Sequence, residues 1–560
     1  MITRLDWAVL VVYLAAITGI GLIVGRRVRR SQEYFLGGRR FGPWVMVSQS
    51  FSVGTHAEMP VALAGAVYGI GASAIWYQWK NLFITPLYWV MAPVFRRVRR
   101  TTMAELMADR YGPLMGAVYI VFALCFFIIE TGGLLKGAGK VISQATGGGA
   151  GVNQIVAAMT IMFVLYSFVG GLVASAWTDL FQGVLIIVLS FMLIPLGWPS
   201  VGGLAGMKSS LAPFHFSLAT PSGIGPWAIA MLTVNGLVGI MAQPHMLATV
   251  GTGRDERTCR VGMLFGNFVK RVCTVGWMFV GLIAAALVVQ GAEGPLSDPE
   301  NAFGYACRRL LFPGALGLLI ASILAASMSA CSAYMVDVGA LFTEGFYRPH
   351  IRSTGSDRHY LWAGRISGAA ITMLGVLYAM FLIQSVLYSF LLTETLATFV
   401  GVSVLGGLVW RRANRWGALA SLLAALATNF LLYYRAGERL DRWDPNVFLA
   451  ALAAGIAAMV VVSLATAPEP SERVASLFDR LETASDPPPP AAPAPRFGAP
   501  GAAVVAPPET RPLLLVNILR LRSAAAGRGW RAFSEDLAGL AAGIGLVLAL
   551  VAATAWLLAR

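Results

Sequence analysis

Long apolar stretches separated by short polar connections fill most of the chain up to residue 466, and one more follows near its end. A helix needs roughly 20 apolar residues to cross a bilayer. The pattern therefore predicts an all-α membrane protein with about fourteen transmembrane helices. They are expected at residues 6–25, 43–69, 73–95, 113–138, 152–170, 178–197, 224–247, 261–290, 312–345, 360–384, 386–410, 415–434, 446–466 and 536–558.

Two of these spans are interrupted by small and polar residues. The second span contains the run from Ser52 to His56, and the seventh contains Asn235-Gly236 and Gln243-Pro244-His245. Unwound backbone at membrane depth is tolerated where it lines a cavity or is buried in protein. Broken helices in corresponding positions of two halves are typical of transporters built from inverted repeats. The separation of five spans predicts an inverted pair of five-helix repeats, spans 2–6 and 7–11.

Composition and charge support a membrane protein. Of the 560 residues 57% are hydrophobic and 12% are charged, and the mean hydropathy is +0.70. A soluble protein carries about 25% charged residues, so most soluble enzyme classes are excluded. The net charge is +15, and its basic residues gather in runs between apolar segments, such as Arg26–Arg30 and Arg96–Arg100. This positive-inside pattern predicts a multi-pass plasma-membrane protein with its N-terminus outside, and no nucleic-acid partner.

Residues 467–512 differ in composition from the rest of the chain. The stretch Pro487–Pro490, followed by alternating Ala and Pro, cannot form a hydrophobic core. It predicts a disordered or semi-rigid cytoplasmic linker. The expected organisation is a transmembrane transport domain over 1–466, the linker over 467–535, and an extra, peripheral transmembrane helix over 536–558.

Ionisable and amide side chains at membrane depth are costly, so they indicate functional roles. His56 and Glu58 lie on the interrupted second span, where they either meet a solute or a proton or satisfy freed backbone groups. Lys80 is expected to form an ion pair with Glu58 or Glu130. The candidates for solute binding or coupling are His56, Glu58, Lys80, Glu130, Asn235, Gln243 and Asp337.

Two further acidic residues leave alternatives open. Asp337 follows Ser329 by eight residues, about two helical turns, so both side chains can share one helix face. A hydrogen bond from Asp337 to a neighbouring helix is the other interpretation. Glu394 follows Thr393 near an expected helix break, and its role stays open.

Four blocks of sequence, in matching order and spacing, resemble the sodium/solute symporter family of sodium-coupled sugar, proline and pantothenate carriers. The resemblance covers about residues 6–466. It implies a LeuT-like fold of five-plus-five inverted repeats, with one preceding helix and additional C-terminal helices. It also implies alternating access and coupling of solute uptake to an ion gradient. The blocks are Glu33–Arg39, Gly170–Gln182, Gln243–His245 and Ala325–Tyr347.

The same resemblance implies a sodium site and an ion-release path that contains Asp179. The position of the family's second ligand hydroxyl is occupied by Ala330, so water or Ser327 would have to replace one of five ligands. Sodium is the first expectation for the coupling ion, and a proton carried by His56 and Glu58 is the alternative. The implied sodium ligands are the carbonyl groups of Ser52, Thr55 and Ala326 and the hydroxyl group of Ser329.

Three functions are compatible with these features to different degrees. The first is a secondary active transporter that takes up a small polar organic solute with a cation. The second is a membrane sensor that keeps the carrier fold. An enzyme is the third, but the chain has no Walker A, HExxH or GxSxG motif. The expected partners are a small-molecule solute and the lipid bilayer, with no cofactor beyond the coupling ion, while the solute and the oligomeric state stay open.

Overall fold

The computed structural model describes residues 2–25, 39–221, 223–292, 294–438, 443–483, 512–521 and 529–560, apart from some side chains within helices. These residues form helices and connections, with one isolated bridge between Phe41 and Gly253. Nine helices of the described chain are long and apolar enough to cross a membrane, or ten with one bent pair. The all-α membrane fold is confirmed, and the count of about fourteen spans stays a prediction. The run Pro487–Pro490, most of the block Glu33–Arg39 and the side chains of 169–174 lie outside the described part.

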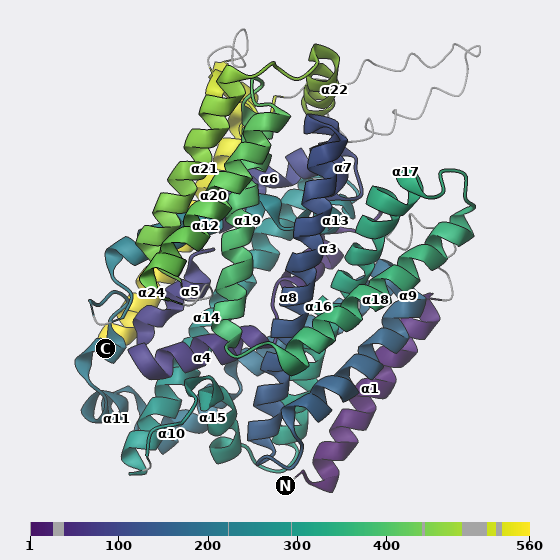
Figure 1. Cartoon of the computed structure of the whole chain (residues 1–560). Coiled ribbons are helices and arrows are strands. Elements are labelled where there is room, and N and C mark those ends of the chain that lie inside the picture. The colour runs from purple at the N-terminus through teal and green to yellow at the C-terminus, as the bar shows by residue number, and fades with distance from the viewer. Residues whose placement is uncertain are drawn as a thin grey trace, which may run out of the picture.

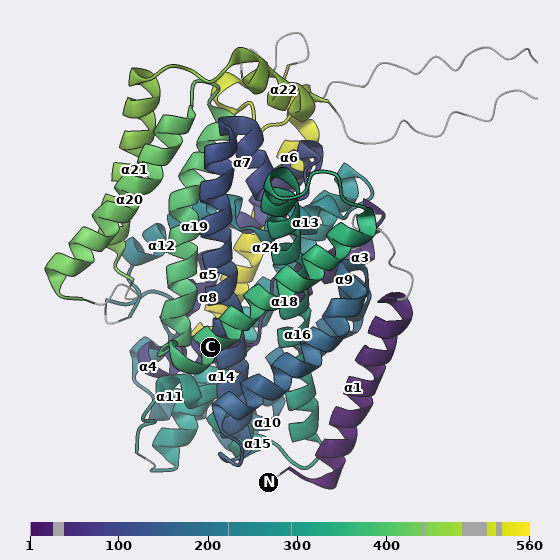
Figure 2. The same ribbon diagram turned by 45° about the vertical axis from the view of Figure 1, so that its right-hand side comes forward.

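The long helices stand side by side in a tall bundle, with the N-terminus at one end and α22 at the other (Figures 1 and 2). They are α1 (Arg4–Gly25), α8 (Pro113–Ala145), α9 (Val152–Phe191), α14 (Glu256–Gln290), α16 (Ala315–Phe342), α18 (Asp357–Phe381), α19 (Val386–Val409), α20 (Arg415–Ala436), α21 (Pro445–Ala465) and α24 (Ser534–Ala559). Shorter helices complete the two ends: α7 (Met103–Tyr111), α10 (Leu193–Ser200), α11 (Gly203–Ser210), α15 (Ala302–Leu310), α17 (Arg348–His350) and α22 (Ser471–Glu482).

Both predicted helix breaks are present. The second span consists of α3 (Pro43–Val53) and α4 (Glu58–Ile70), which are separated by residues 54–57. The seventh consists of α12 (Pro226–Gly239), a 3-10 turn at Ile240–Ala242 and α13 (His245–Gly251), and it bends by 64°. These two breaks place unpaired backbone groups in the middle of the bundle.

A third break was not predicted. The sequence predicts one continuous span at 73–95, but the structure divides it into a 3-10 turn, α5 (Trp76–Trp79) and α6 (Ile84–Val98). Pro86 lies in the first turn of α6, where its missing N–H is harmless. The same ring would clash with the carbonyl group four residues earlier if the helix continued upstream. The prediction of an unbroken span is therefore wrong here.

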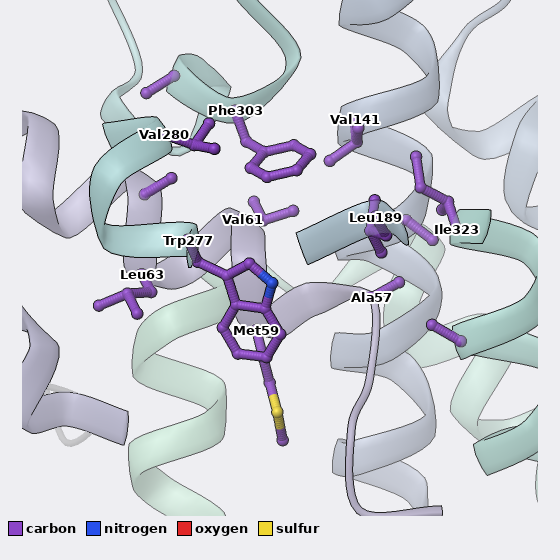
Figure 3. Packing of buried hydrophobic residues seen from close by; sticks show 14 of the residues in the cluster. Ala57, Met59, Val61, Leu63, Val141, Leu189, Trp277, Val280, Phe303 and Ile323 are labelled. Carbon is purple, nitrogen blue, oxygen red and sulfur yellow. The ribbon is translucent and has the colours of Figure 1, made fainter. Parts of the chain in front are cut away.

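Close helix packing holds the first break in place. A Cβ atom on Gly137 of α8 would lie 2.5 Å from Glu58 Cβ, and one on Gly266 of α14 would lie 2.6 Å from the Val47 carbonyl oxygen. Only glycine permits both approaches. In Figure 3, Met59 and Val61 of α4 pack among apolar side chains from α8, α9, α14 and α15 around the fully buried Trp277. The halves of the broken helix are thus fixed by their neighbours rather than by their own hydrogen bonds.

The preceding helix α1 caps the start of α16. Asp6 Oδ1 accepts hydrogen bonds from the backbone N–H groups of Gly314 (2.8 Å) and Gly317 (2.7 Å). Asp6 Oδ2 accepts from the N–H and hydroxyl groups of Thr3. A carboxylate at a helix N-terminus satisfies N–H groups that have no partner within the helix. This contact ties α1 to the helix that carries Ser329.

At the opposite end of the bundle, α22 lies across α6 and α7 (Figure 1). Its buried face consists of Leu477, Phe478 and Leu481. Arg480 of α22 and Arg100 both donate hydrogen bonds to Asp109 Oδ2, at 2.6 and 2.7 Å. Within the predicted linker, this segment is therefore an ordered amphipathic helix.

The attachment of α22 is expected to weaken in acid. Burial raises the pKa of Asp109, but the hydrogen bonds from Arg100 and Arg480 outweigh burial and lower the pKa below its ordinary value. A lowered pKa contributes stability above about pH 4 that is lost as the pH falls through the lowered value. Hydrogen exchange of residues 471–482 is expected to accelerate below about pH 4, after correction for intrinsic rates.

Asp109→Asn is expected to give this faster exchange already at neutral pH and to remove the acid response. Asp357→Asn, at the start of α18, is the matched control and should keep the wild-type profile. Unchanged protection of α22 down to about pH 3 in the wild-type protein would show that Asp109 does not hold the helix.

Candidate functional site

A small cavity of about 40 Å³ lies where the two predicted breaks face each other. The first break contributes Val53, Gly54 and His56 to its wall, and the second contributes Gln243 and His245. Further lining side chains come from the other central helices and include Asn81, Tyr88, Phe126, Glu130, Asn267, Lys270, Arg271, Tyr334, Phe390 and Glu394.

Side chains satisfy the carbonyl groups that the first break leaves unpaired. His56 Nε2 lies 2.6 Å from the Val53 carbonyl oxygen, and Lys270 Nζ donates to the Gly54 carbonyl oxygen. The sequence left open whether His56 meets backbone or solute. The structure shows that it contacts freed backbone and also lines the cavity.

His56, Glu58 and Glu130 form a buried cluster, and two of its members, His56 and Glu130, line the cavity. His56 Nδ1 lies 2.8 Å from Glu58 Oε1, and one possible ligand atom from each of the three side chains falls within 4.8 Å of the others. Glu130 Oε1 accepts a hydrogen bond from the Thr393 hydroxyl group at 2.5 Å. Both ring nitrogens of His56 face acceptors, and only the imidazolium form donates from both. The geometry therefore favours a charged His56 paired with Glu58.

A second buried ion pair lies beside the cavity, and its carboxylate, Glu394, lines the wall. Lys80 Nζ lies 2.7 Å from Glu394 Oε2, with side-chain exposures of 0% and 5%, and Gln243 Nε2 donates to Glu394 Oε1 at 2.8 Å. The predicted pairing of Lys80 with Glu58 or Glu130 is wrong, because the break before α6 directs Lys80 towards α19. The expected break at Glu394 is also wrong, since α19 is continuous from Val386 to Val409.

The residues implied for sodium binding meet Asp179 beside the first break. Ser329 Oγ on α16 donates to Asp179 Oδ1 at 2.5 Å, and Ser52 Oγ on α3 donates to the Asp179 carbonyl oxygen at 3.1 Å. Asp179 is fully buried, and its Oδ2 has no hydrogen-bond partner in the described part of the chain. Asp179 lies within α9, and its predicted position near the membrane boundary stays a prediction.

The other residues implied for the sodium site are buried or already hydrogen-bonded within their own segments. Thr55 Oγ donates to the Phe51 carbonyl oxygen at 2.6 Å, and Ala326 is completely buried in α16. Ser327, one replacement suggested for the hydroxyl missing at Ala330, donates to the Ile323 carbonyl oxygen of its own helix at 2.8 Å. The carboxylate of Asp179 is therefore better placed than Ser327 to supply an additional oxygen.

Four predicted site residues are not among the described residues that line the cavity: Glu58, Lys80, Asn235 and Asp337. Asn235 and Asp337 have surroundings of their own. Asn235 Nδ2 donates to Thr395 at 3.2 Å, and the Asn235 carbonyl oxygen accepts from the Thr398 hydroxyl group at 2.8 Å. These bonds join α12 to α19. Asp337 is buried on α16, and neither it nor Asn235 is among the described residues that line the cavity.

Sequence reasoning missed three prominent wall residues: Lys270, Arg271 and Tyr334. Lys270 and Arg271 fall inside the predicted span 261–290 and are ionisable at membrane depth, so the criterion that selected Lys80 would have found them. Tyr334 lies with its hydroxyl group 3.2 Å from His56 Nε2. No comparable signal marks Tyr334, because apolar helices contain many aromatic residues.

The sequence matches known transporters over most of its length. The profile of the family described as "Sodium:solute symporter family" matches residues 34–425. The osmoregulated proline transporter OpuE of Bacillus subtilis is 26% identical over 433 residues, which cover 74% of this chain and 86% of that protein. A sodium/proline symporter of Staphylococcus aureus is 27% identical over 422 residues, 70% of this chain and 78% of that protein.

Solved structures show the same fold. A Na⁺-coupled sialic acid symporter in a substrate-bound outward-open state superposes with a TM-score of 0.70 at 18% identity, over 83% of this chain and 99% of that one. The nucleobase-cation-symport-1 family transporter Mhp1 in a closed conformation gives a TM-score of 0.53 at 16% identity, over 80% of this chain and 98% of that one. With its two broken helices and a family match over more than half of its length, this chain belongs to the sodium:solute symporter family of multi-pass membrane transporters.

Proposed function

We propose that the protein is a symporter that couples the inward movement of Na⁺ to uptake of a small polar organic solute by alternating access. The contact between Ser329 and Asp179 beside the first helix break carries this proposal. Hard cations prefer oxygen ligands, and a carboxylate supplies both oxygen and negative charge. The carbonyl groups of Ser52, Thr55 and Ala326 and the hydroxyl group of Ser329 bind the ion, and Asp179 compensates for the hydroxyl missing at Ala330.

The solute binds in the central cavity. Its wall is lined by charged and amide side chains, including His56, Glu130 and Gln243, which suits a polar molecule. The matched relatives are named for proline, and the structural neighbour for sialic acid, both of which are small polar solutes. The solute site in the cavity is therefore separate from the ion site beside Ser329.

Proton coupling is the second candidate, and the His56–Glu58 pair favours it. His56 Nδ1 and Glu58 Oε1 are 2.8 Å apart, and His56 lines the cavity, from which a bound proton would be released to one face of the membrane. Under this alternative, His56 and Glu58 carry the proton and the site near Ser329 holds no driving ion.

The two ends of the bundle support the proposed orientation. The arginines Arg96–Arg100 lie at the end of α6 beside α22, and the N-terminus lies at the opposite end (Figure 1). Positive charge favours the cytoplasm, so the N-terminus is outside. Residues 1–466 carry transport through two inverted five-helix repeats, 467–535 link the cytoplasmic end, and α24 is an accessory span in the plasma membrane.

Uptake into proteoliposomes tests the coupling ion. A panel of labelled solutes that includes proline and sialic acid is offered with an imposed Na⁺ gradient, an imposed proton gradient, or neither. The Na⁺ gradient is expected to drive accumulation, and Ser329→Ala is expected to raise the Na⁺ concentration for half-maximal uptake about fivefold, as for loss of one uncharged ligand. Ser327→Ala is the matched control on the same helix. Accumulation driven only by protons would overturn sodium coupling.

A further inference from the structure

Around the central cavity, positively charged side chains outnumber negatively charged ones. Lys80 is paired with Glu394, and His56 is paired with Glu58, so these four groups contribute little net charge. Three further charged side chains line the cavity, and two of them are cations on adjacent positions of α14. These three are Lys270, Arg271 and Glu130.

Lys270 has unused hydrogen-bonding capacity. Its side chain is 6% exposed, and its recorded hydrogen bond is to the Gly54 carbonyl oxygen. An ammonium group has three donors, so two remain for another partner. Lys270 forms no ion pair with any carboxylate in the described part of the chain. The Glu58 and Glu394 carboxylates act on its charge from a distance, but each of them is already paired with another cation.

Arg271 adds a second cation with no ion pair among the described residues. It is 1% exposed, its Nη1 lies 3.4 Å from the Gln78 carbonyl oxygen, and its Nε has no hydrogen-bond partner within the described ranges. Both cations also line the cavity wall that faces the break at Gly54. A buried charge without a counter-charge costs several kcal/mol, so this wall is suited to an anionic ligand.

The remaining carboxylate belongs to a different part of the wall. Glu130 accepts from Thr393 and lies in the His56–Glu58 cluster rather than against Lys270. A neutral solute would leave the excess positive charge in the cavity unchanged. A zwitterion would do the same, because it brings one charge of each sign.

We propose that the transported solute is a small organic anion and that Lys270, with Arg271 beside it, binds its carboxylate group. This inference rests on the proposed transport function and specifies the class of solute. Lys270 is then the residue that selects for negative charge, while Gln243 and the other polar wall groups contact the rest of the solute.

Ligand-induced thermal stabilisation of the purified full-length protein tests the charge preference. Straight-chain and hydroxylated carboxylates of about two to nine carbons are each compared with the matching amide, and butyrate is also compared with 4-aminobutyrate and butylamine. At least one carboxylate is expected to raise the Tm in Na⁺ buffer, with no shift for its amide. Stabilisation by an amide or a zwitterion equal to that by the carboxylate would overturn the proposal, as would no shift by any carboxylate.

Substitution of Lys270 tests the assignment. Lys270→Met is expected to weaken carboxylate binding about a hundredfold, as for loss of a charged hydrogen bond. Lys270→Arg keeps the charge and is expected to stay within about tenfold. Lys136→Met, outside the cavity on α8, is the matched control. Wild-type carboxylate affinity in Lys270→Met would overturn the assignment, and if that variant does not fold, Lys270→Gln replaces it.

Sodium stabilisation separates this inference from the proposed function. Na⁺ alone, compared with choline, is expected to raise the Tm of the wild-type protein and of Lys270→Met. Stabilisation by Na⁺ together with no carboxylate effect would refute anion recognition while sodium coupling stands. A carboxylate shift that is the same in Na⁺ and choline would instead refute the coupling and leave Lys270 as the anion-binding residue.

Discussion

Replacing Lys80 by methionine is expected to lower the free energy of unfolding by about 3–5 kcal/mol, because it leaves the Glu394 carboxylate buried without its cation. Lys80 Nζ and Glu394 Oε2 are 2.7 Å apart, and both side chains are shielded from solvent. Gln243 still donates to Glu394 in the variant, but an amide does not neutralise a carboxylate. Denaturant-induced unfolding in detergent micelles measures the change.

The double substitution Lys80→Met with Glu394→Leu identifies the cause. Removing both charges is expected to recover most of the loss, because a buried ion pair and an apolar pair of similar volume have comparable stability. The exposed pair Arg411–Glu482 is the control, and Arg411→Met should cost less than about 1 kcal/mol. A double variant as unstable as Lys80→Met alone would contradict the charge argument and point to lost packing.

Asp179→Asn is expected to raise the Na⁺ concentration for half-maximal uptake by roughly tenfold to a hundredfold, equivalent to about 1.5–3 kcal/mol of ion binding. The carboxylate of Asp179 accepts from Ser329 and keeps its second oxygen without a described partner. Asparagine preserves the shape and one oxygen but removes the negative charge. Sodium-dependent uptake in proteoliposomes, measured at fixed solute concentration over a range of Na⁺, gives the value directly.

Two comparisons make the Asp179 result specific. Asp337→Asn changes another buried carboxylate near Ser329 in the sequence and should leave the Na⁺ response within about twofold. Solute affinity at saturating Na⁺ should be unchanged in Asp179→Asn, because the cavity residues are intact. A normal Na⁺ response in Asp179→Asn would remove this carboxylate from the ion site.

The sequence predicts the fold where a single property, either apolar length or helix propensity, determines the structure. Apolar length marks the spans, and Gly54 and Pro244 lie at the breaks because small residues and proline disfavour continuous helix. The break before α6 escaped prediction because the segment from Ala72 to Phe95 is mostly apolar on both sides of the break. Hydropathy indicates which segments lie in the membrane, but it does not indicate where the helix within such a segment is broken.

The candidate site could be predicted only as a set of polar residues. The sequence identifies His56, Glu58 and Lys80 as costly groups at membrane depth. It does not reveal that Lys80 pairs with Glu394, since that contact joins residues 314 positions apart and depends on the direction of α19. Partner choice among buried charges is a property of packing, which one sequence does not display.

The capping of α16 by Asp6 also sets a delay during synthesis. Asp6 belongs to α1, and its partners Gly314 and Gly317 follow 308 and 311 residues later. At about 5–20 residues per second, roughly 15–60 s pass before those partners leave the ribosome. Until then, Thr3 is the only one of these hydrogen-bond partners of Asp6 that has been made. The contact between α1 and the start of α16 thus forms only after Gly317 has been translated.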